Sequence, residues 1–176
     1  LGLSTIPSDH PLYKGMLGMH GNIGPNINTN RCDLLVAIGM RFDDRVTGDT
    51  SKYARQAKIV HIDIDSSEFD KNIKTTATVH GDAKEVLIKL LPLIKETKHT
   101  EWLKTFDECD AVEQEKVVKR EVFPESGPMN MGEVAYKVSK ATGDKAVLIT
   151  DVGQNQLFSS RYFRYTLPKS IITSGR

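Results

Sequence analysis

Residues 34–39 read LLVAIG and residues 59–64 read IVHIDI. Both are short, continuous apolar runs, which is typical of strands buried in a parallel sheet. A weaker run, ATVH, follows at residues 77–80. The segments between these runs are long enough for the crossovers that parallel pairing requires. Residues 30–95 are therefore expected to form parallel strands flanked by helices.

Helices are predicted on both sides of these strands. A short helix over residues 22–31 should precede the first strand. After the third strand, Asp82 is placed to cap a helix, with Glu85 three residues further on. The apolar face of that helix is expected to comprise Val86, Leu87, Leu90, Leu91 and Ile94.

The composition changes after residue 95. Residues 96–125 hold nine acidic residues, five basic residues and no glycine, which predicts a mostly exposed helix over residues 101–121. The sequence FPESGP at residues 123–128 breaks that helix. An α/β pattern then resumes, and its expected elements are a helix capped by Asn130 with a buried face of Val134, Ala135, Val138 and Ala141, a strand at 146–149, a helix at 153–162 and a strand from 171.

The overall composition excludes several classes of protein. The chain has 176 residues, 39% of them hydrophobic, and a formal net charge of +1. No apolar run approaches the roughly 20 residues that span a membrane. The near-zero charge provides no long-range attraction for nucleic acid. The two cysteines, Cys32 and Cys109, make no disulfide framework, so a reducing, cytoplasmic location is predicted.

The first candidate site is GMRFDDRVTG at residues 39–48. It follows a buried strand, and ligands bind at the carboxyl ends of strands in open α/β sheets. Gly39 allows close backbone approach, and Arg41 and Arg45 suit a pyrophosphate, with Asp43 and Asp44 orienting them. A surface loop with self-neutralising charges explains the composition equally well.

The second candidate site lies on the next strand. His61, Asp63 and Asp65 alternate with apolar residues, so they share one side of the strand and its exit. An acidic group at the end of this strand is where a dinucleotide-binding unit hydrogen-bonds a ribose. A metal site is the less favoured alternative, because no second cluster of ligands accompanies these residues. After the third strand, Gly81 and Asp82 offer a helix start that could meet an adenine or a ribose, beyond the capping role of Asp82.

Two further glycine motifs carry weaker signals. GMLGMHG at residues 15–21 is favoured as a loop over a turn that brings Met19 and His20 against a flat ring. DVGQNQ at residues 151–156 places a glycine at a strand-to-helix turn, where backbone N–H groups can face an anion. Gln154 and Asn155 could donate to phosphate oxygens there, although an ordinary turn has the same spacing.

Four motifs together resemble the catalytic subunits of acetohydroxyacid synthase, also called acetolactate synthase, a family of thiamine diphosphate enzymes. They are GMLGMHG at 15–21, RFDDRVTG at 41–48, KIVHIDID at 58–65 and VGQNQ at 152–156, in the family's order. The resemblance implies a fragment of a three-domain α/β enzyme. Its expected parts are the later portion of an incomplete, Rossmann-like three-layer central domain at 1–95, a charged linker at 96–128 and the start of the thiamine-diphosphate-binding α/β domain at 129–176.

The resemblance also implies an activity and its cofactors. The family condenses two pyruvates, or pyruvate and 2-oxobutyrate, with release of CO2 on the route to branched-chain amino acids. It uses thiamine diphosphate and Mg²⁺, and it binds FAD without net redox. The implied partners are 2-oxoacid substrates, a second copy or more of the chain and a regulatory small subunit, with no nucleic acid and no membrane.

The resemblance also implies which residues of this chain contact the cofactors, because they stand at positions that match the family's motifs. The implied FAD contacts are Met19, His20, Gly39, Arg41, Arg45, Asp63, Ile64, Glu68, Gly81 and Asp82, and the implied diphosphate contacts are Val152, Gly153, Gln154 and Asn155. The family usually has His where Asn155 stands, and Asn can still donate a hydrogen bond.

No catalytic or metal-binding residue is expected within the chain. The resemblance places the activating Glu in the first domain and the Gly-Asp-Gly metal motif beyond Arg176. The fragment alone is therefore predicted to be inactive and to bind no cofactor tightly. The alternatives are another thiamine diphosphate carboligase, a pyruvate oxidase or a stand-alone nucleotide-binding module.

Overall fold

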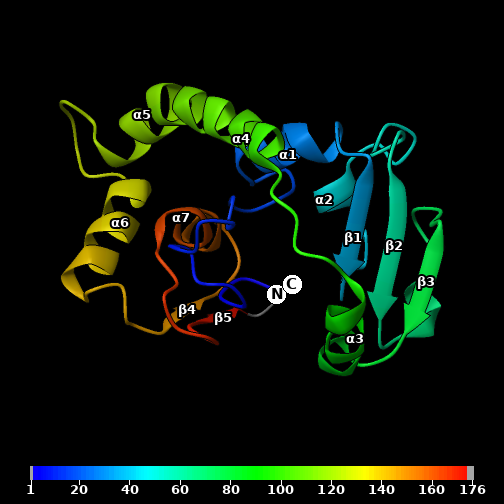
Figure 1. Cartoon of the computed structure of the whole chain (residues 1–176). Coiled ribbons are helices and arrows are strands. Elements are labelled where there is room, and N and C mark those ends of the chain that lie inside the picture. Colours follow the sequence, from blue (N-terminus) through cyan, green and yellow to red (C-terminus); the bar gives the residue numbers. More distant parts are fainter. Residues whose placement is uncertain (1, 174–176) are drawn as a thin grey trace. The chain divides into compact units, whose positions relative to one another are not determined.

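The computed structural model describes residues 2–173. The chain divides into two compact units, one formed by residues up to Pro25 together with those from Thr105 onward, and the other by Asn26–Lys104. Each unit has its own parallel sheet, as Figure 1 shows. No helix in the described part of the chain has the length and apolar character needed to cross a bilayer.

The Asn26–Lys104 unit is built on a three-stranded sheet. Its strands are β1 (Leu34–Ile38), β2 (Lys58–Asp63) and β3 (Ala77–His80), in the order β1-β2-β3. Both pairs are parallel, with Leu35 opposite Ile59 and Val60 opposite Ala77. The three strands and their parallel pairing are confirmed, and each lies within one residue of its predicted bounds.

Short helical elements connect and flank these strands. Asp82 caps the helix after β3, because its Oδ1 accepts from the backbone N–H of Lys84 at 2.9 Å and of Glu85 at 3.2 Å. That helix ends at Leu90, earlier than the predicted apolar face, because Pro92 lacks the N–H that an α-helix needs. The elements are α1 (Ile23–Thr29), α2 (Asp44–Thr47), a 3-10 turn (Ser66–Glu68), α3 (Ala83–Leu90) and a second 3-10 turn (Leu91–Leu93).

The two faces of this sheet are covered unequally. On one face, Ala37 and Ile59 pack against loop residues in a core with Phe42, Tyr53, Ala54 and Ile73. On the other face, α3 contacts β2, and Ile62 is fully buried. The described residues leave the β1 part of that second face bare, since Leu34, Val36 and Ile38 are 53%, 46% and 41% exposed.

The other unit combines helices with a two-stranded parallel sheet. The long helical run after residue 99 is continuous to Val122, but it contains a π-helical turn in its middle. The elements are α4 (Thr100–Glu113), the π turn (Gln114–Val118), α5 (Lys119–Val122), α6 (Met131–Ala141), β4 (Leu148–Thr150), α7 (Gln154–Tyr162) and β5 (Ile171–Thr173). Their order and type agree with the predicted pattern.

Two details of this unit differ from the sequence prediction. The run over residues 101–121 was expected to be mostly exposed, yet Glu113 is buried, with three donors around its carboxylate.

Helix α6 agrees with the prediction at its cap and differs from it at its buried face. Asn130 caps α6 as predicted, accepting from Glu133 N–H at 3.0 Å. The predicted buried face of α6 was wrong in part. Ala135 is buried against Val122 and Tyr162, whereas Val134, Val138 and Ala141 are exposed, because no described residue covers their side of the helix.

The bare face of β1 generates a prediction about association. Parallel sheets are normally covered on both faces, and an edge strand with an apolar face pairs readily with another chain. Residues 1–176 expressed alone should therefore self-associate in a sedimentation velocity experiment. Replacing Val36 and Ile38 together by Lys should shift the distribution toward monomer. Leu12→Lys, at an exposed apolar position outside this face, should not do so. A monomeric wild-type chain would contradict the prediction.

Candidate functional site

The carboxyl ends of β1, β2 and β3 lie at one edge of the sheet. Gly39, which follows β1, donates its N–H to the carbonyl oxygen of Ile62 at 2.9 Å. Gly81, which follows β3, donates its N–H to the carbonyl oxygen of Asp63 at 2.9 Å. Both glycines thus continue the backbone hydrogen-bond ladder of the sheet to the end of β2. The structure thereby brings together the three strand ends that the sequence singled out.

The loop after β1 turns around a buried phenylalanine. Phe42 has a positive φ of 52° and is almost fully buried, with its ring against Tyr53 and His61. Such a backbone conformation is uncommon outside glycine and persists only where packing fixes it. The burial of Phe42 leaves the neighbouring Arg41 side chain exposed beside Asp43, at 3.3 Å between Nη2 and Oδ2. The expected orientation of Arg41 by Asp43 is therefore present.

His61 and Asp63 lie on one face of β2, as the period of two predicts. His61 is fully buried between the perpendicular rings of Phe42 and Phe69. Its Nε2 is 3.6 Å from Asp63 Oδ2, beyond hydrogen-bond length. Asp63 is also buried, and its Oδ1 accepts from the backbone N–H of Asp65 at 2.9 Å. Within residues 2–173, no group of three His, Cys, Asp or Glu side chains is placed to hold a metal ion.

Two buried carboxylate oxygens at this edge have no hydrogen-bond partner among the described residues. They are Oδ1 of Asp43 and Oε2 of Glu68. The other oxygen of Glu68 accepts from Lys71 Nζ at 2.7 Å. A buried acceptor left without a donor is costly, so each such atom calls for an explanation, for which a bound molecule is one answer. The edge therefore offers acceptors for hydroxyl groups beside an exposed guanidinium.

The remaining candidates of this unit lie in the loops that follow the strands. Ile64 and Arg45 are exposed, Arg45 on the first turn of α2. Asp82 is exposed, and its Oδ1 is engaged in the helix cap. At Gly39, whose φ is +61°, a Cβ would meet no atom within 4 Å, so the space beside the strand end is open.

The other unit holds the last predicted positions. Met19 and His20 are exposed in a turn closed by the hydrogen bond from Gly21 N–H to the Gly18 carbonyl at 2.9 Å. The four diphosphate candidates, Val152, Gly153, Gln154 and Asn155, are exposed where β4 leads into α7. Gly153 has φ +109° and open space beside it, and the first N–H groups of a helix have no intrahelical partner. An anion can therefore reach this helix start.

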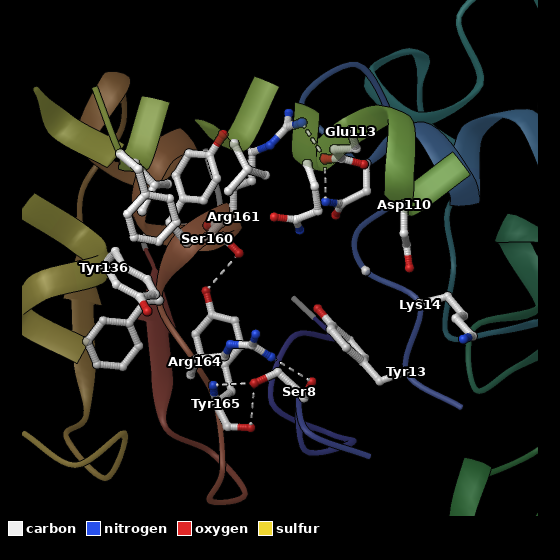
Figure 2. Close-up of a pocket in the computed structure, with 18 residues that line it drawn as sticks. Ser8, Tyr13, Lys14, Asp110, Glu113, Tyr136, Ser160, Arg161, Arg164 and Tyr165 are labelled. Atoms are coloured by element: carbon white, nitrogen blue, oxygen red, sulfur yellow. Dashed lines mark hydrogen bonds and ion pairs between the residues drawn. The ribbon is translucent and has the colours of Figure 1, made fainter. Parts of the chain in front are cut away.

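This unit also contains a pocket of about 350 Å³ that the sequence did not reveal. Figure 2 shows Tyr13, Asp110 and Arg164 facing the pocket from three different segments. Burial raises the pKa of Tyr13 and of the Asp110 carboxyl. No sequence motif links the lining residues, because they converge only in the folded chain. Among them is Glu113, which the sequence placed on an exposed helix.

The family described as "Thiamine pyrophosphate enzyme, central domain" matches residues 1–90. The chain belongs to the thiamine pyrophosphate enzyme family. The match spans β1, β2 and β3, so the sheet edge with Arg41 and Asp63 lies within the family's central domain.

Several curated relatives of this thiamine pyrophosphate enzyme chain are named acetolactate synthases. The chain is 38% identical to a probable acetolactate synthase large subunit of Methanocaldococcus jannaschii and 35% identical to the acetolactate synthase large subunit of Lactococcus lactis. It is 37% identical to the corresponding protein of Corynebacterium glutamicum. Each alignment covers 99% of this chain and 28–30% of the relative. The chain thus spans less than a third of the length of these relatives, and the family resemblance in its motifs is confirmed.

The packing of Phe42 generates a prediction about the sheet edge. Phe42→Ala removes the ring that fixes the loop after β1, and truncating a buried Phe costs about 3–5 kcal/mol. The free energy of unfolding from urea titration of the whole protein should fall by that amount. Phe123→Ala, at a half-exposed ring, should cost several-fold less. Equal losses for the two variants would show that Phe42 does not anchor the loop.

Proposed function

We propose that the chain is part of an acetolactate synthase large subunit. The whole protein would condense two pyruvates, or pyruvate and 2-oxobutyrate, to acetohydroxyacids with release of CO2, in the synthesis of branched-chain amino acids. The observation that carries the proposal is the bonding of Gly39 and Gly81 to the end of β2. This bonding sets RFDDRVTG and HIDID at one sheet edge, in a chain that aligns over 99% of its length with named acetolactate synthases.

The proposal assigns residues 1–95 to the later part of the central domain and this sheet edge to FAD. Arg41 and Arg45 would bind the pyrophosphate, and Asp63 and Glu68 would accept from ribose or ribityl hydroxyls. The residues fit such a group, because Oδ1 of Asp43 and Oε2 of Glu68 are buried acceptors with no donor among the described residues, and the space beside Gly39 is open. Gly81, Ile64 and Asp82 complete this set, and Met19 and His20 belong to it by family resemblance. FAD in this role supplies no net redox.

The proposal assigns residues 129–176 to the start of the diphosphate-binding domain, joined through a linker at 96–128. Gly153, Gln154 and Asn155 would hold the diphosphate of thiamine diphosphate at the start of α7, where the first backbone N–H groups of a helix have no intrahelical partner. When bound, thiamine diphosphate supplies the electron sink for carbon–carbon bond formation. The proposal assigns the Mg²⁺ ligands and the activating Glu to other parts of the whole protein.

The family resemblance also supports a cytoplasmic protein that acts on 2-oxoacids as a homodimer or larger assembly, with a regulatory small subunit. A stand-alone nucleotide-binding module is less well supported. The similarity to the synthases runs through α7 as well as through the central-domain region, and a nucleotide-binding module requires only the latter.

The assay that tests the proposal uses the whole protein with pyruvate, thiamine diphosphate, Mg²⁺ and FAD. Acetolactate should form and should require thiamine diphosphate, and residues 1–176 alone should form none. With inorganic phosphate and O2 added, acetyl phosphate and hydrogen peroxide would instead identify a pyruvate oxidase, and a different carbon–carbon condensation product would identify another carboligase. Turnover by residues 1–176 alone would contradict the fragment assignment.

A further prediction concerns Arg41, one of the two arginines proposed to bind the pyrophosphate. A charge-assisted hydrogen bond contributes about 1.5–3 kcal/mol, so Arg41→Ala should weaken FAD binding by roughly tenfold or more. The measurement is a flavin fluorescence titration of the whole protein. Arg55→Ala is the matched control, because Arg55 is an exposed arginine before the amino end of β2, away from the site. Unchanged affinity in Arg41→Ala would place the pyrophosphate elsewhere.

A further inference from the structure

A buried carboxylate joins three segments of the unit that contains α7. Glu113, at the end of α4, is 3% exposed. Its Oε1 accepts from Asn22 Nδ2 at 2.7 Å and from Arg161 Nη2 at 2.5 Å, and its Oε2 accepts from the backbone N–H of Ile23 at 2.8 Å. Figure 2 shows Arg161 and Glu113 at one end of the pocket. Both oxygens of this carboxylate are therefore occupied by donors from α7 and from residues 22–23.

On one side, Glu113 fixes the glycine turn at residues 15–22. Asn22, which it holds, accepts from Met16 N–H through Oδ1 at 2.8 Å and donates its own N–H to the Met16 carbonyl at 2.7 Å. Gly15 has φ +103°, and a Cβ there would collide with the Asn22 side chain. Arg161 Nη1 also donates to the Gly21 carbonyl at 3.2 Å. The shape of the turn thus depends on the group that anchors Asn22.

On the other side, Glu113 holds α7 through Arg161. Arg161 stands in the last turn of α7, whose first turn carries Gln154 and Asn155. With a rise of about 1.5 Å per residue, the two ends are about 10 Å apart along a single rigid helix. Fixing Arg161 therefore fixes the direction in which the start of α7 points.

The ion pair between Glu113 and Arg161 is better suited to fix the positions of the segments it joins than to stabilise the fold. A buried ion pair contributes little more stability than apolar residues of the same size, because both charges must lose their water. Removing one partner, however, leaves the other charge buried and unpaired. The carboxylate also lies directly before a π-helical turn, a feature frequent at functional sites.

We infer that Glu113 is a positioning residue that holds the turn at residues 15–22 and helix α7 in one arrangement, and thereby couples FAD binding to thiamine diphosphate binding. The inference rests on the proposed function, which assigns Met19 and His20 of the turn to FAD and Gln154 and Asn155 of α7 to the diphosphate. A coupling of this kind is reciprocal, so each cofactor must change the affinity of the other by the same factor.

The test is a pair of flavin titrations of the whole protein, one without and one with saturating thiamine diphosphate and Mg²⁺. In the wild type, thiamine diphosphate should change the FAD dissociation constant about fivefold or more. In Glu113→Ala, that factor should fall toward one. Glu115→Ala, two residues further along and largely exposed, should keep the wild-type factor.

A second variant covers the case in which Glu113→Ala fails to fold, as judged by circular dichroism. Arg161→Lys keeps the positive charge but cannot reach Glu113 and the Gly21 carbonyl together, so it should lose most of the coupling. Full coupling in a folded Glu113→Ala, or in Arg161→Lys, would overturn the inference. So would a wild type that binds both cofactors independently. A wild type that binds neither cofactor would instead contradict the proposed function.

Discussion

The parallel pairing of β2 between β1 and β3 is the constraint on which the Asn26–Lys104 unit depends. Parallel strands all end at one edge, so this pairing alone places the loops after Ile38, Asp63 and His80 together. The register is equally important, since a slip of one residue would move His61 and Asp63 to the opposite face. The bonds from Gly39 and Gly81 to the last residues of β2 extend the pairing beyond the strands themselves. The sheet therefore brings the three loops together, and packing within a loop, as at Phe42, fixes its shape.

The sequence was sufficient for the features that depend on local pattern. Apolar runs predicted β1 and β2, and the capping roles of Asp82 and Asn130 followed from side-chain chemistry one turn away. Features that depend on distant partners could not be predicted. Glu113 looked like one more charge on a solvated helix, and only its contacts with Asn22 and Arg161, 91 and 48 residues away, make it an interior group. The exposure of Val134 and Val138 has the same origin, because helical spacing identifies an apolar face but not what covers it.

The candidate site residues also divide into those that a local sequence pattern predicts and those that only the fold reveals. Arg41 and Asp43 were predicted from a motif, and their proximity follows from their being two residues apart. The role of Phe42 between them was not predicted, since a positive φ at a buried ring is visible only in the fold. The motif thus identifies the residues proposed to contact a ligand. The residues that orient them, such as Phe42, follow no spacing that can be recognised in the sequence. His61 shows the limit of periodicity, which placed it on the correct face but could not show that Phe42 and Phe69 enclose it.

Unpaired polar atoms and bare apolar surface point to one physical conclusion about this chain. Among residues 2–173, nothing donates to the buried oxygens of Asp43 and Glu68, and nothing covers the apolar side chains of β1. Both features cost free energy in the isolated chain, and both would be relieved by groups from outside it. A molecule that binds only the folded state stabilises that state in proportion to the logarithm of its concentration over its dissociation constant. Hydroxyl donors at the sheet edge would therefore stabilise the fold as well as occupy the site. Ligand binding would then also determine how well the loops after β1 and β2 are ordered. The carboxylates of Asp43 and Glu68 belong to these loops and would also contact the ligand.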